Sequence, residues 1–281
     1  MYGPMVLAAI EQNEPPGRRL VDDDLAAAFL PRTLRMLVRA TRFRPLRGAL
    51  VAASERSGPG LWTNMAGRKH FIDDKLDQSV AEMAAVVILG AGLDTRGYRL
   101  ARHRSIPVFE VDQPVNIARK AVIVRRVFGV PPASVRLVPI DFECDDLSSV
   151  LSAHGYRPAD RTFFVWEGVT QYLTEAAVRA TLTQLSHAAP GSRLVFTYVR
   201  QEFIDGADHY GAESLYRRFR QRRQIWKTGL RPGEVRDFLA GFGWRLIEQV
   251  GPQEYLRDYV RPAGRDLAAS DLEWTAYAEK V

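Results

Sequence analysis

Glycines and carboxylates that could bind a ligand follow four apolar runs of the chain. The first run, 86–89, leads into Gly90 and Gly92, and the later runs end at Asp112, Asp141 and Glu167. Glycine has no Cβ, so its backbone can turn tightly and approach a ligand closely. Carboxylates are ionised at neutral pH and accept hydrogen bonds. Together these residues could surround a ligand that presents hydroxyl, amino and cationic groups.

The four runs are predicted to be strands of a parallel sheet. Residues 86–89 are all branched and apolar with no polar alternation, which is typical of a strand buried on both faces. The other runs occupy 107–111, 135–140 and 161–166. Open α/β sheets bind ligands at the carboxyl ends of their strands, where these side chains would meet. A helix is predicted from Asp94 or Thr95 to Arg102, with one of the first two as N-cap.

The spacing of the glycines departs from the dinucleotide-binding fingerprint. That fingerprint is Gly-x-Gly-x-x-Gly, but here Thr95 takes the third place and the next glycine is Gly97. An ordinary strand-to-helix turn is therefore an open alternative. Asp112 favours the ligand interpretation, because doubly wound folds place the carboxylate that binds ribose hydroxyls about twenty residues after the glycines.

Several strings together resemble the leucine carboxyl methyltransferase family, and more narrowly its bacterial S-adenosylmethionine-dependent branch. They are residues 88–96 (Ile-Leu-Gly-Ala-Gly-Leu-Asp-Thr-Arg), 110–114 (Glu-Val-Asp-Gln-Pro), 141–142 (Asp-Phe) and 167–173 (Glu-Gly-Val-Thr-Gln-Tyr-Leu). Residues 67–74 resemble the arginine and aspartate segment that precedes the family's first strand. The resemblance implies an α/β fold of the class I methyltransferase type. Such a fold has a Rossmann-like, seven-stranded, mostly parallel sheet, helices on both faces and an N-terminal helical cap.

The resemblance also implies S-adenosyl-L-methionine as the cofactor. Its site would be formed by Arg68, Gly90, Gly92, Asp112, Asp141, Phe142 and Glu167. Arg68 would bind the carboxylate of the methionine part, a task that suits a guanidinium fork. Gly90 would lie against that part, and Glu167 near the amine and the sulfonium. Asp112 would accept from the ribose hydroxyls, while Asp141 and the Phe142 amide would bind the adenine.

No general base stands out in the sequence, and the catalytic residue stays unknown. His70, His187 and His209 are available, but an acidic acceptor is ionised at pH 7 and needs no base. The predicted function is O-methylation of a carboxylate or hydroxyl on a small molecule or natural product. The alternatives are a nicotinamide-dependent oxidoreductase and a non-catalytic protein that binds S-adenosylmethionine.

The composition of the chain limits the kinds of partner that we expect it to bind. The 281 residues carry a net charge of +6 and 46% hydrophobic residues, enough for a sizeable core. There is no lysine-rich tail, so we expect no nucleic-acid partner. The only cysteine is Cys144, so neither a disulfide within the chain nor a cysteine-based metal site is expected, and we predict no metal. No apolar run approaches the ~20 residues that span a bilayer, so we expect no membrane association and a cytoplasmic location. The sequence does not define the oligomeric state.

The chain is predicted to divide at residue 80. Residues 1–80 have helical character and would form the N-terminal helical cap, with Asp22, Asp23 and Asp24 capping one helix. Residues 81–281 would form the Rossmann-like domain, which adds strands at 193–199, 244–250 and 272–281, the last antiparallel. Residues 200–231 would be an inserted lid on the acceptor side, with an arginine-rich helix at 215–226. A solvated basic helix is the alternative for that segment.

Overall fold

Seven strands form one sheet in the computed structural model, which describes residues 2–281. Their spatial order is β3-β2-β1-β4-β5-β7-β6. The strands are β1 (Ala85–Leu89), β2 (Val108–Asp112), β3 (Val135–Pro139), β4 (Thr162–Trp166), β5 (Arg193–Val199), β6 (Trp244–Val250) and β7 (Glu273–Lys280). The first five are parallel, and β7 pairs antiparallel with both β5 and β6. The predicted α/β class and the antiparallel last strand are confirmed.

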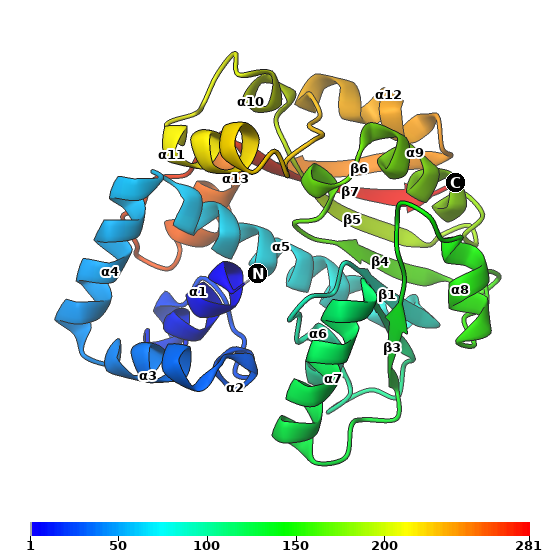
Figure 1. Ribbon diagram of the computed structural model, residues 1–281, viewed down its shortest axis with the longest axis horizontal. Helices are drawn as coiled ribbons and strands as arrows, with labels where there is room; N and C mark the ends of the chain where they lie inside the picture. The colour runs from blue at the N-terminus through cyan, green and yellow to red at the C-terminus, as the bar shows by residue number, and fades with distance from the viewer. Residues whose placement is uncertain (1) are drawn as a thin grey trace.

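Helices cover both faces of the sheet, and β1 shows how the strands divide their side chains. Successive side chains of a strand point to opposite faces. Val87 and Leu89 pack into the core under α8 (Leu147–Ala153), α9 (Glu175–Leu185) and α12 (Val235–Ala240). Val86 and Ile88 pack against residues of α5 (Leu61–Ser79) on the other face. Figure 1 shows α5 running along this part of the sheet. Because both faces are covered, β1 has no polar position.

The crossover helices begin at residues that favour a helix start. The side chain of Asp146 accepts from the Ser149 amide at the start of α8, and Thr174 accepts from the Ala177 amide at the start of α9. Helix α7 (Pro114–Phe128) starts with proline, which suits the first turn of a helix. The short helix α6 (Arg96–Leu100) has Thr95 as its N-cap residue, but no side chain caps it.

The first part of the chain forms helices beside the carboxyl end of β1. They are α1 (Gly3–Glu11), η1 (Pro16–Arg18), α2 (Ala26–Phe29), α3 (Arg32–Ala40) and α4 (Arg44–Ser57). Their apolar core continues into α6 and α7, where Tyr98 lies 5.4 Å from the Phe29 ring and 5.3 Å from the Phe128 ring. The division at residue 80 stays a prediction, and α5, which precedes it, packs on the sheet.

The predicted capping by three aspartates is wrong. Helix α2 has Leu25 at its N-cap and no side-chain cap. Asp23 instead is buried and accepts from the Thr95 hydroxyl at 2.7 Å, while Asp22 pairs with Arg19. Thr95, which follows β1, binds the Asp23 carboxylate, so a tertiary hydrogen bond takes the place of the predicted helix cap.

The insertion after β5 folds onto its own apolar cluster. It contains α10 (Gln201–Asp205), α11 (Glu213–Leu215) and the π-helical turn η4 (Tyr216–Arg222). The predicted helix 215–226 is therefore wrong beyond Arg222. There the chain reverses through Gln224, which has a positive φ of 51°, so that Trp226 stacks on Phe219 at 5.1 Å. Burial of Trp226 outweighs continuation of the helix.

Short elements complete the chain. They are η2 (Val80–Glu82), η3 (Thr170–Tyr172), η5 (Pro232–Glu234), α13 (Pro252–Tyr255) and η6 (Leu256–Val260). Within residues 2–281, no helix has both the length and the apolar character to traverse a bilayer.

Candidate cofactor site

The turn after β1 depends on glycine. Gly90 and Gly92 both have positive φ, 69° and 47°, a region that side chains with Cβ rarely adopt. A Cβ on Gly90 would lie 2.3 Å from Cγ2 of Val169, in the loop that follows β4. The amides of Gly90 and Ala91 both donate to the Val111 carbonyl of β2. The turn therefore packs closely between the end of β2 and the loop that follows β4.

Asp112, the last residue of β2, is bonded directly to this turn. Its Oδ2 accepts from the Gly92 amide at 2.6 Å. Its Oδ1 accepts from the Gln113 amide at 2.7 Å and from the Asn116 side chain at 2.8 Å. A carboxylate has about four lone-pair positions, so three bonds leave one position free, on Oδ2. The structure therefore brings Asp112 and the glycine turn together, as the sequence predicts.

Asp141 and Phe142 lie beside Asp112. The Ile140 amide at the end of β3 donates to the Asp112 carbonyl at 2.9 Å, so the two strand ends are adjacent. Asp141 accepts from the Glu143 amide at 3.0 Å, and the Cys144 amide donates to the Asp141 carbonyl. The Phe142 N–H has no partner among residues 2–281. This strand end thus keeps a backbone donor available for a ligand.

Glu167, which follows β4, is held by three cations. Its carboxylate lies 3.0 Å from Nε of Arg68, 2.7 Å from Nη1 of Arg96 and 3.4 Å from Nζ of Lys69. Burial alone raises the pKa of Glu167, but the charges of Lys69, Arg96 and Arg68 outweigh burial and hold it well below the ordinary glutamate value. Glu167 is therefore a buried anion at neutral pH.

Arg68, on α5, has two of its three nitrogens occupied. Its Nε donates to Glu167, and its Nη1 donates to both carboxylate oxygens of Glu273, at 2.5 and 2.7 Å. Nη2 has no hydrogen-bond partner in the described part of the chain. It faces Gly168, where a Cβ would lie 3.2 Å from it. Glycine at 168 leaves space beside a free guanidinium donor.

Arg96, Asp73 and Glu273 complete this group of ion pairs, although no role was predicted for them from the sequence. Arg96 is 2% exposed and contacts Asp73 and Asp94 at 2.5 Å each, besides Glu167. Arg96 and Asp73 do lie in strings that resemble the family. Glu273 has no such signal, because it opens β7, about a hundred residues after Glu167.

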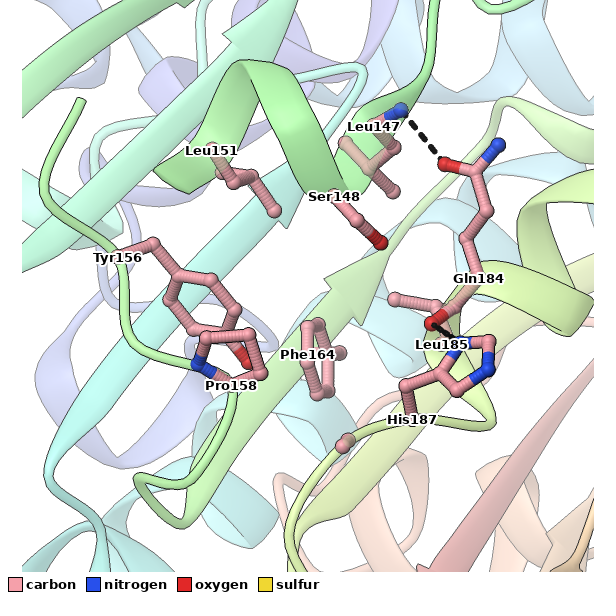
Figure 2. Close-up of a pocket in the computed structure, with 10 residues that line it drawn as sticks. Leu147, Ser148, Leu151, Tyr156, Pro158, Phe164, Gln184, Leu185 and His187 are labelled. Carbon is pink, nitrogen blue, oxygen red and sulfur yellow. Dashed lines mark hydrogen bonds between the residues drawn. The ribbon is translucent and has the colours of Figure 1, made fainter. Parts of the chain in front are cut away.

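Two cavities of the fold lie away from these residues. Figure 2 shows one between α8 and α9, lined by Leu147, Tyr156, Phe164 and His187, with a volume of about 20 Å³. That is room for roughly one water molecule. A cleft of about 540 Å³ lies between α4 and residues 265–267. We call the ion-paired residues Arg68, Lys69, Asp73, Asp94, Arg96, Glu167 and Glu273 the carboxyl-edge cluster. Neither cavity is lined by any of them, so the site is defined by its polar groups.

The strand order, with an antiparallel seventh strand between the fifth and the sixth, defines a class I methyltransferase fold. Two solved structures share it at low sequence identity. A DUF574 family protein from Streptomyces avermitilis has a TM-score of 0.58 and 16% identity, over 84% of this chain and 91% of that one. A provisionally named sarcosine dimethylglycine methyltransferase from Galdieria sulphuraria has a TM-score of 0.51 and 11% identity, over 75% and 83%.

The chain belongs to the leucine carboxyl methyltransferase family, whose model matches residues 2–186. Two relatives carry the provisional name S-adenosyl-L-methionine-dependent methyltransferase. One, from Mycolicibacterium paratuberculosis, is 37% identical over 199 residues, which cover 65% of this chain and 61% of that relative's length. The other, from Mycobacteroides abscessus, is 33% identical over 221 residues, which cover 72% and 68%. The family that the sequence motifs indicated is confirmed.

Proposed function

We propose that the protein transfers a methyl group from S-adenosyl-L-methionine to an oxygen atom of a small acidic acceptor. Family membership supports the donor, as do the names of the relatives. A nicotinamide-dependent oxidoreductase is not favoured, because the chain belongs to a methyltransferase family and lacks the third glycine of the dinucleotide fingerprint.

The observation that carries the proposal is a set of unfilled hydrogen-bonding positions at adjacent strand ends. The Phe142 N–H and Nη2 of Arg68 are donors without partners among the described residues, and Asp112 keeps one acceptor position. These positions match the adenine ring, the methionine carboxylate and a ribose hydroxyl. Gly92 lies beside the Asp112 carboxylate and Gly168 beside Nη2 of Arg68, and neither glycine has a side chain that would fill the space there. The residues present therefore fit the donor.

Glu167 supports the same arrangement through its partners. It fixes Nε of Arg68 and Nη1 of Arg96, so both guanidinium groups keep one orientation. Its own carboxylate adds a negative charge at the end of β4, where the proposal places the amine and sulfonium of the donor. The ion pairs thus orient Arg68 before any ligand binds, which lowers the cost of ordering it.

S-adenosyl-L-methionine supplies a methyl group that its sulfonium already activates for displacement. The protein has to hold donor and acceptor in line, and such alignment can contribute roughly 7–11 kcal/mol. An acidic acceptor requires no base at neutral pH. The three candidate histidines contact other parts of the molecule: His70 lies near the Leu20 carbonyl, His187 near the Gln184 carbonyl and His209 on the Tyr216 ring.

Residues 200–231 form the acceptor side in this proposal. The segment packs on η3, just beyond Glu167. The Lys227 amide donates to the Gln171 carbonyl at 2.6 Å, and the Thr228 hydroxyl donates to the Leu173 carbonyl at 2.8 Å. Four of its arginines are exposed: Arg217, Arg218, Arg222 and Arg223. Arginine forks favour anionic partners, which supports an acidic acceptor.

Calorimetry with S-adenosylhomocysteine tests the donor site. Asp112→Ala should weaken binding about ten- to a hundred-fold, because it removes charge-assisted bonds worth roughly 1.5–3 kcal/mol. Asp160→Asn is the matched control, since Asp160 pairs with Arg157 on the surface. The ligand should also raise the melting temperature of the wild-type protein, and nicotinamide cofactors should not. An unchanged dissociation constant for Asp112→Ala would overturn the assignment.

A further inference from the structure

Large apolar side chains are exposed where α3 meets α4. Phe43 is 67% exposed, Met36 65%, Leu37 41% and Leu46 40%. They are four of the ten large hydrophobic residues that are exposed among residues 2–281, and they lie within eleven positions of sequence. Scattered exposed apolar residues need no explanation, whereas a cluster of them marks an interaction surface.

The same segment carries several positive charges and no acidic residue of its own. There is no aspartate or glutamate from residue 25 to residue 54. Five arginine side chains of this segment have no ion pair or hydrogen bond within the described part of the chain: Arg32, Arg35, Arg39, Arg42 and Arg44. Arg47 differs, because it is buried and bonded to Glu14 at 2.6 Å. The five arginines are therefore free to meet an anionic partner.

Helix α3 sorts its residues between an inner and an outer face. Leu34 and Val38 pack into the N-terminal core, as positions four apart share a face. Arg32, Met36 and Arg39 lie on the opposite, exposed face. The connection to α4 then presents Arg42, Phe43 and Arg44 in a row. Figure 1 shows this corner at the lower left of the molecule, away from the sheet. We call residues 32–46 the α3–α4 surface.

We propose that the α3–α4 surface binds a bilayer that contains anionic lipids. Phe43 and Met36 would enter the boundary between headgroups and acyl chains, and the arginines would contact lipid phosphates, as in interfacial helices that are basic and amphipathic. Duplex nucleic acid would contact the arginines through its phosphates but offers no apolar layer for phenylalanine and methionine. This proposal departs from the expectation of no membrane association, which rested only on the lack of a run long enough to span a bilayer.

Vesicle flotation tests this proposal with the full chain. The wild-type protein should float with vesicles of phosphatidylcholine and phosphatidylglycerol, and not with phosphatidylcholine alone. Binding should weaken at high salt. The variant Arg32→Gln/Arg39→Gln/Arg42→Gln should lower the partition coefficient by roughly fivefold per arginine. Phe43→Ser should lower it as well, while the salt dependence stays the same. Thermal unfolding should be unchanged, because these side chains are exposed.

The matched control is Arg217→Gln/Arg222→Gln/Arg223→Gln, which removes the same charge from another exposed segment. It should float as the wild type does. Equal loss of binding in this control would overturn the proposal, because it would show attraction to net charge alone. Equal binding of Phe43→Ser and wild type would also overturn it. So would binding of an oligonucleotide that is as tight as binding of the vesicles.

Discussion

The carboxyl-edge cluster and the α3–α4 surface use arginine in opposite ways. Arg96 is 2% exposed and contacts three carboxylates, whereas Arg39 and Arg42 are exposed and have no side-chain partner in residues 2–281. A buried arginine that is surrounded by acids fixes a geometry. An exposed arginine without acids creates a field that screening by salt can weaken. Both regions are rich in arginine. Whether an arginine holds a fixed geometry or attracts a partner depends on whether acidic side chains surround it.

Removal of Arg96 should give the largest effect. Arg96→Ala leaves Asp73, Asp94 and Glu167 without a common partner in a buried place, and breaking such a pair costs about 3–5 kcal/mol. Urea unfolding measures this cost. Arg102→Ala is the control, because Arg102 pairs with Asp24 at an exposed place, where a pair contributes about 1 kcal/mol or less. Equal costs for the two variants would contradict the distinction.

Glu167 should make stability depend on pH. Its folded pKa lies below the unfolded value of 4.5, so its contribution is complete above pH 4.5 and is lost as pH falls below that value. Glu167→Gln should therefore cost about 1.5–3 kcal/mol at pH 7, and less as the solution becomes more acidic. Unfolding curves at several pH values give the difference.

The control for Glu167 is Glu175→Gln, on the exposed surface of α9, where Glu175 pairs with Arg179. Its cost should be small at every pH. If the cost of Glu167→Gln did not change with pH, the depressed pKa would be wrong.

The arginines of the insertion should have a smaller effect, and on the acceptor only. Arg217→Gln/Arg222→Gln/Arg223→Gln should raise the KM for an acidic acceptor a few-fold and leave kcat unchanged, because exposed charges steer association. The difference should shrink at high salt. Arg32→Gln/Arg39→Gln/Arg42→Gln removes equal charge at the α3–α4 surface and should not change KM. A KM that is independent of salt would argue against the role of the insertion.

A chelator should have no effect on methyl transfer. Among residues 2–281, no group of three or more histidine, cysteine, aspartate or glutamate side chains could hold a metal ion. The measurement is activity with and without EDTA. Inhibition by EDTA that a divalent ion reverses would show that a metal takes part.

The central strands β1, β2, β4 and β5 could be predicted because they are buried on both faces and their sequences are mostly apolar. Runs such as 193–199 and 244–250 match β5 and β6 to the residue. The meeting of Gly92 and Asp112 could also be predicted, because they lie at the carboxyl ends of neighbouring parallel strands. The structure of the insertion, residues 200–231, could not be predicted from such runs. Trp226 turns the chain back onto Phe219, and no local pattern encodes that contact.

The partners of the carboxyl-edge cluster were also beyond the sequence. Arg68 could be singled out from a motif, but Glu273 lies on a strand about two hundred residues later. Only the fold brings them together. Asp23 shows the reverse case, because its sequence context suggested a helix cap, while the structure uses it to hold Thr95. The charged residues could be identified in the sequence, but the partners they bind are set by the tertiary fold.

Cys144 offers a spectroscopic handle on this site. It is the only cysteine of the chain, it is exposed, and it lies two residues after Phe142 at the end of β3. A thiol-reactive fluorophore therefore attaches at one defined position of the wild-type protein, with no substitution required. Its emission would report the binding of donor and product at the neighbouring strand ends in real time.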